Sequence, residues 1–60
     1  MMPLKQKIAQ LEALHLQVEH AKQEEEQKGH EWQVAEQQAR KTELEMELEI
    51  LRLEEEEKRR

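Results

Sequence analysis

The side chains that could do chemistry in this chain are three histidines and fifteen acidic residues, all of them glutamates. His30 and Glu31 begin the helical motif of zinc proteases, but Val34 stands where the second histidine would be needed. His20 with Glu24, and Glu26 with His30, have the i, i+4 spacing of a weak surface metal site. Such pairs are common on solvated helices, so we predict no metal site.

Catalysis also lacks its other requirements. The chain contains no serine or cysteine to act as a nucleophile. Its glutamates are spread over helix surface that faces solvent, where no pocket would raise a carboxyl pKa for acid–base work. We therefore expect that this protein is not an enzyme, has no catalytic residues and needs no cofactor.

A seven-residue series organises the apolar residues. The series runs from Leu4 to Leu53 in steps of seven, and seven of its eight residues are apolar; the exception is Glu25. A strict seven-residue repeat keeps one side of a helix against a partner helix and winds the pair left-handed. The series therefore predicts a coiled coil, and it consists of Leu4, Leu11, Val18, Glu25, Trp32, Ala39, Met46 and Leu53.

Composition supports an all-α fold. The 60 residues are 42% charged and 35% hydrophobic, and Asp, Asn, Ser, Cys, Tyr and Phe are missing. The chain is dominated by strong helix formers and has almost no turn formers. Pro3 suits the first turn of a helix, because its missing N–H would have no partner there. We predict one long coiled-coil helix over residues 1–60.

The weakest part of that helix is its polar centre at residues 22–31, which includes the only glycine, Gly29. A glycine costs about 1 kcal/mol inside a helix, which neighbouring strong formers can absorb. Lys28 followed by Gly29 also resembles the end of a helix. A helical hairpin turning at residues 28–30 is therefore the second arrangement that the sequence allows.

The polar layers of the series indicate how two helices would pair. A parallel dimer would place Lys22 against Lys22 and repeat this conflict at several glutamates, whereas antiparallel pairs whose numbers add to 61 leave one like-charge layer. In that pairing Lys22 meets Ala39 in the seam, Glu19 meets Arg40 at its flank, and Trp32 covers Gly29 as the largest contribution. We predict an antiparallel dimer. Its interface consists of Leu4, Ile8, Leu11, Val18, Gly29, Trp32, Ala39, Met46, Ile50 and Leu53.

A second apolar stripe lies near the carboxyl end. Leu44, Leu48 and Leu51 are about 200° around the helix from Met46, Ile50 and Leu53. A dimer that buries one stripe leaves the other exposed. The leucine stripe is therefore predicted as a second interface, for a tetramer or for another protein.

Other partner classes are disfavoured. A net charge of -5 without a basic face argues against nucleic acid and against anionic membranes. The sequence has no apolar run of roughly 20 residues and no signal-peptide pattern, so we predict no membrane insertion. We expect a cytoplasmic protein.

The heptad series and the Glu-, Gln- and Lys-rich residues that flank it resemble a rod segment of an intracellular scaffold, tether or motor-associated coiled-coil protein. The resemblance covers the whole chain, but it is generic and carries no family motif. It implies that the segment joins or spaces two copies of a larger protein. The alternative is a helical platform for a protein partner such as an adaptor or a small GTPase.

Overall fold

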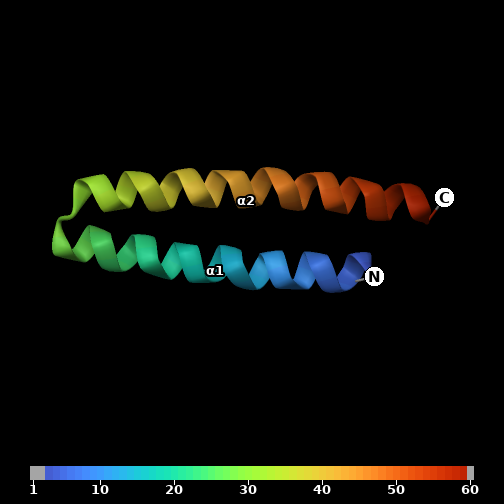
Figure 1. Ribbon diagram of the computed structural model, residues 1–60, viewed down its shortest axis with the longest axis horizontal. Helices are drawn as coiled ribbons and strands as arrows, with labels where there is room; N and C mark the ends of the chain where they lie inside the picture. Colours follow the sequence, from blue (N-terminus) through green and yellow to red (C-terminus); the bar gives the residue numbers. More distant parts are fainter. Residues whose placement is uncertain (1–2, 60) are drawn as a thin grey trace.

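The computed structural model describes residues 3–59, which form two α-helices joined by a short turn. Helix α1 spans Leu4–Lys28, and helix α2 spans Glu31–Lys58. The helices lie side by side and antiparallel in a rod of 47 × 15 × 15 Å (Figure 1). The predicted all-α class is confirmed, in the hairpin arrangement. Within residues 3–59, neither helix is long and apolar enough to cross a membrane.

Helix α1 begins directly after Pro3. Pro3 has φ -64° and ψ 150°, and its carbonyl oxygen accepts hydrogen bonds from the N–H groups of Gln6 and Lys7 at 3.0 and 3.1 Å. No side chain caps this end. Proline's fixed φ thus sets the start of the helix, although Pro3 lies just before the first turn instead of inside it.

The turn is the point at which the structure departs from one continuous helix. Gly29 has φ 74° and ψ 21°, in the left-handed region that favours glycine. Its N–H donates to the Glu26 carbonyl at 3.1 Å, and the His30 N–H donates to the Glu25 carbonyl at 3.0 Å. These two bonds form a Schellman motif, which satisfies carbonyls that the helix end leaves free. The prediction of a single long helix is corrected here, because Gly29 ends α1 and the turn falls within residues 28–30.

A further backbone hydrogen bond in the turn leads the chain into the start of α2. His30 has φ -85° and ψ 76°, close to an inverse γ-turn, and the Glu31 N–H donates to the Gly29 carbonyl at 3.1 Å. The Val34 N–H then donates to the His30 carbonyl at 3.0 Å and starts the helical ladder. Because Gly29 and His30 are not helical, the rotational phase of α2 is independent of that of α1.

Helix α1 packs with the face that the heptad series predicts. Ile8 is buried, with 9% of its surface exposed, and the other members of this face are half-buried. The face has the alternating three- and four-residue spacing of a coiled-coil seam. It consists of Leu4, Ile8, Leu11, His15, Val18, Lys22 and Glu25.

Helix α2 packs with the face opposite to the one expected. Leu48 is buried, with 4% of its surface exposed, whereas Met46, Ile50 and Leu53 are more than half exposed. Continuing the seven-residue series through α2 would have turned Glu36 and Glu43 toward α1, and buried unpaired carboxylates are costly. The break at the turn lets α2 present another face, which consists of Val34, Gln37, Lys41, Leu44, Leu48, Leu51 and Glu55.

The pairs across the two helices also differ from the expected ones. Glu19 pairs with Lys41, not with Arg40, and Lys22 bonds to Gln38 instead of lying on Ala39. The numbers in both of these pairs add to 60. The hairpin is therefore centred on the Gly29–His30 turn, whose bonds fix the register.

Candidate interaction surface

The most exposed apolar side chains lie on the side of α2 that faces away from α1. Trp32 is 74% exposed, Met46 60%, Ile50 56% and Leu53 57%, and Ala39 lies exposed among them. Because a helix rotates by about 100° per residue, these five share one direction, roughly opposite to buried Leu48. We call them the outer stripe: Trp32, Ala39, Met46, Ile50 and Leu53.

The outer stripe has an acidic border. Within about 85° of its mean direction, α2 carries seven glutamates and no lysine or arginine, at the helical rotation of 3.6 residues per turn. All seven side chains are exposed. The acidic border consists of Glu31, Glu36, Glu43, Glu47, Glu49, Glu54 and Glu57.

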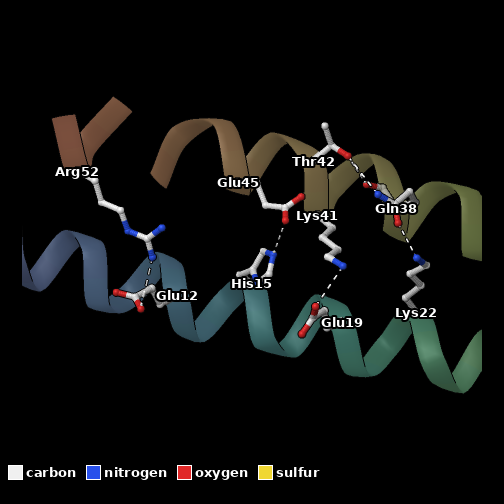
Figure 2. A network of polar contacts seen from close by, with 9 residues as sticks. All are labelled: Glu12, His15, Glu19, Lys22, Gln38, Lys41, Thr42, Glu45 and Arg52. Carbon is white, nitrogen blue, oxygen red and sulfur yellow. Dashed lines mark hydrogen bonds and ion pairs between the residues drawn. The ribbon is translucent and has the colours of Figure 1, made fainter. Parts of the chain in front are cut away.

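Polar contacts hold the opposite side of α2 against α1 (Figure 2). The Lys22 ammonium donates a hydrogen bond to Gln38 Oε1 at 2.6 Å, in a partly buried layer. Lys41 Nζ lies 3.1 Å from Glu19 Oε1. Gln38 and Lys41 were not predicted as contact residues, since they fall at solvated positions when α2 is given the rotational phase of α1.

Two of the basic residues of α2 are thereby turned toward α1. Lys41 pairs with Glu19, and Arg52 Nη2 lies 3.7 Å from Glu12 Oε2 (Figure 2). The remaining bases of the helix, Arg40 and Lys58, fall about 100° from the centre of the outer stripe. Among the described residues, neither Arg40 nor Lys58 forms an ion pair within 4 Å with a glutamate of the acidic border.

The contact with Lys41 changes the pKa of Glu19. The hydrogen bond from the Lys41 ammonium, and then its positive charge, lower the pKa of the Glu19 carboxyl from its ordinary value of 4.5. A bonded cation stabilises the ionised carboxylate. This pair thus couples the stability of the hairpin to pH.

His15 and His30 lie next to different glutamates. His15 lies in the seam, with Nε2 3.4 Å from Glu45 Oε2 but without a hydrogen bond to any described residue. His30 Nδ1 lies 2.7 Å from Glu25 Oε2, so it pairs with Glu25 and not with Glu26 as an i, i+4 helical spacing would require. Across residues 3–59, no group of three histidine or acidic side chains could hold a metal ion.

A groove runs beside the seam and reaches the outer stripe at Leu53. It has a volume of about 740 Å³, and Ala13, Leu16 and Leu48 contribute apolar lining. Glu45, Glu49 and other charged side chains line the rest. The groove has no constellation of nucleophile, base and oxyanion donors, since its polar groups are carboxylates, Arg52 and His15.

The structure divides the predicted interface residues into two groups. Leu4, Ile8, Leu11 and Val18 lie on the packed face of α1, whereas the outer stripe residues are exposed, and Trp32 does not cover Gly29. Leu44, Leu48 and Leu51, the leucine stripe predicted as a second interface, lie on the face of α2 that packs against α1. The outer stripe as an interface between chains stays a prediction.

Comparison with family models, with curated proteins and with solved structures gave no match for this chain.

Proposed function

We propose that this helical hairpin is a protein-association element that binds another helix through the outer stripe of α2. The observation that carries the proposal is the exposure of Trp32, Met46, Ile50 and Leu53 along one side of a single helix. Trp and Met are enriched at the centres of protein interfaces. Met46, Ile50 and Leu53 lie within two turns of one another, and a cluster of exposed apolar side chains of this kind is typical of an interaction site.

The small core of the hairpin supports the same proposal. Among residues 3–59, only Ile8 and Leu48 are buried apolar residues. Burial of each side chain stabilises the fold by roughly 1.5 to 3 kcal/mol. Ordering the backbone costs about 1 to 2 kcal/mol for each residue, so two buried side chains offset only a small part of the total cost. Two-helix units of this size gain stability when further helices pack on them. Association would therefore stabilise the fold as well as join two molecules.

The spacing of the outer stripe suits a helix as the partner. Trp32, Ala39, Met46 and Leu53 are seven residues apart, and Ile50 lies one turn from Met46 and Leu53. This is the repeat that keeps a helix in contact along its length. The partner could be a second copy, which gives the dimer or tetramer expected from the sequence, or another protein, such as an adaptor or a small GTPase.

In either form the segment would serve as an oligomerising or spacer unit, or as a docking platform, of a cytoplasmic scaffold. These roles need no catalytic group, metal or cofactor. The heptad series supports self-association, and the uncovered helix face of the hairpin supports a heterologous partner.

The test compares the chain with a Met46→Gln/Ile50→Gln variant. Both are measured by sedimentation equilibrium over a wide concentration range, alone and with synthetic amphipathic helices whose polar positions are Lys, Gln or Glu. We expect the chain to associate with itself or with a probe, and the variant to lose this association. Because both side chains are exposed, the variant should keep its helicity and melting temperature at low concentration.

A Leu14→Gln/Leu16→Gln variant is the matched control, since it replaces two exposed apolar residues of α1. It should associate like the original chain. If the chain binds neither itself nor any probe, or if the outer stripe variant associates as well as the control, the proposal is wrong.

A further inference from the structure

We infer that the partner of the outer stripe is a basic amphipathic helix, one with Lys or Arg on both sides of an apolar face. The inference rests on the proposed function, and it names the class of partner that fits the same surface. It is carried by the juxtaposition of the outer stripe with the acidic border.

The charge of this face is one-sided. Seven exposed glutamates flank the outer stripe, and no basic residue lies in the same arc. Among the described residues, none of the seven forms an ion pair within 4 Å. Their charges are therefore available to a partner, and complementary potentials guide association and select among partners.

The packing of the hairpin directs two basic side chains of α2 away from the outer stripe and its acidic border. In α2, Lys41 and Arg52 are directed toward Glu19 and Glu12 of α1 (Figure 2). With the opposite phase, both bases would lie near the outside of the helix. The same choice of phase therefore exposes the outer stripe and holds these two basic side chains against α1, on the far side of α2.

A second copy of the chain fits this face less well. Two outer stripes packed antiparallel would bring together residues on the same side of each helix, among them Glu36, Glu43 and Glu47. Like charges placed opposite each other across an interface oppose association. A lysine- or arginine-rich helix would replace each of these repulsions by an attraction while burying the same apolar side chains.

Trp32 provides the measurement, because it is the only tryptophan and lies 74% exposed in the outer stripe. Three tryptophan-free probe helices share one Leu/Ala face and differ only in having Lys, Gln or Glu at the polar positions, all strong helix formers. Titration of the whole chain is followed by the blue shift of Trp32 fluorescence. We expect the Lys probe to bind most tightly, the Gln probe weakly and the Glu probe not at all, with the Lys affinity falling as salt is added.

Variants locate the charges responsible. Glu43→Gln/Glu47→Gln removes two members of the acidic border. It should lower the affinity for the Lys probe about three- to tenfold and leave the affinity for the Gln probe unchanged. Glu24→Gln/Glu26→Gln removes the same charge from exposed positions of α1 and should change neither. Met46→Gln/Ile50→Gln should abolish binding of both probes.

The possible failures are distinct. The inference of a basic partner is wrong if the Gln probe binds as tightly as the Lys probe. It is also wrong if Glu24→Gln/Glu26→Gln lowers the affinity for the Lys probe as much as Glu43→Gln/Glu47→Gln does. In both cases the outer stripe would still be an association surface. Self-association through the stripe that excludes the Lys probe would identify a second copy as the occupant and overturn the inference. Absence of any binding, to probes or to itself, would overturn the proposed function.

Discussion

His30 and Glu25 are joined twice across the turn. The His30 N–H donates to the Glu25 carbonyl at 3.0 Å, and His30 Nδ1 lies 2.7 Å from Glu25 Oε2. Both contacts require the chain to reverse after Lys28, since a continuous helix would direct the His30 N–H to Glu26. Between the two partners lies Gly29, whose positive φ makes this geometry accessible.

Replacing Gly29 by Ala should therefore destabilise the hairpin by about 1 to 2 kcal/mol, the cost of the left-handed conformation for a residue with a Cβ. No heavy atom lies within 4 Å of the position that the new Cβ would occupy, so the cost comes from the backbone and not from a clash. Urea unfolding followed by circular dichroism measures it. A Lys28→Ala variant is the control, because that position is helical. A gain of stability in Gly29→Ala would show that a continuous helix is preferred.

Sequence alone could predict the helices and the packed face of α1, because helix propensity and heptad spacing are local properties. It could also identify Gly29 and its neighbours as the alternative turn. The phase of α2 could not be extrapolated, since two non-helical residues reset it and the choice between its two stripes depends on packing energy. If α2 packed with its other stripe, Glu36 and Glu43 would be turned toward α1, and burying their carboxylates would be costly. This cost explains why the leucine stripe packs against α1 and the outer stripe does not.

The two stripes of α2 predict opposite effects of substitution. Leu48→Ala should lower the free energy of unfolding by about 2 to 4 kcal/mol, because Leu48 is 4% exposed. Met46→Ala removes a side chain of similar size that is 60% exposed and should change it by less than about 0.5 kcal/mol. Urea midpoints at low protein concentration, where the hairpin is not associated, provide the comparison. Greater damage from Met46→Ala would mean that α2 packs with the outer stripe.

Replacing His15 by Leu should stabilise the hairpin. Its Nε2 is enclosed in the seam and has no hydrogen-bond partner among the described residues, and an unsatisfied polar group costs about 1 to 3 kcal/mol. A leucine suits this seam position between Leu11 and Val18. The melting temperature should rise, whereas His20→Leu, at an exposed position of the same helix, should leave it nearly unchanged. A lower melting temperature for His15→Leu would indicate that the contact with Glu45 stabilises the fold.

The pair of Glu19 and Lys41 predicts how stability depends on pH. The pKa of the Glu19 carboxyl is lowered in the folded chain, first by the hydrogen bond from Lys41 and then by its charge. The unfolded chain therefore takes up this proton more readily, so the stabilisation is present above the ordinary value of 4.5 and is lost as pH falls through the lower folded pKa. In Glu19→Gln that loss should disappear, which reduces the difference between unfolding midpoints at neutral pH and at about pH 3. Glu24→Gln, which removes an exposed carboxylate that forms no ion pair within the described residues, is the control and should keep the original pH dependence. An unchanged pH dependence in Glu19→Gln would show that the Lys41 contact contributes nothing to the stability of the fold.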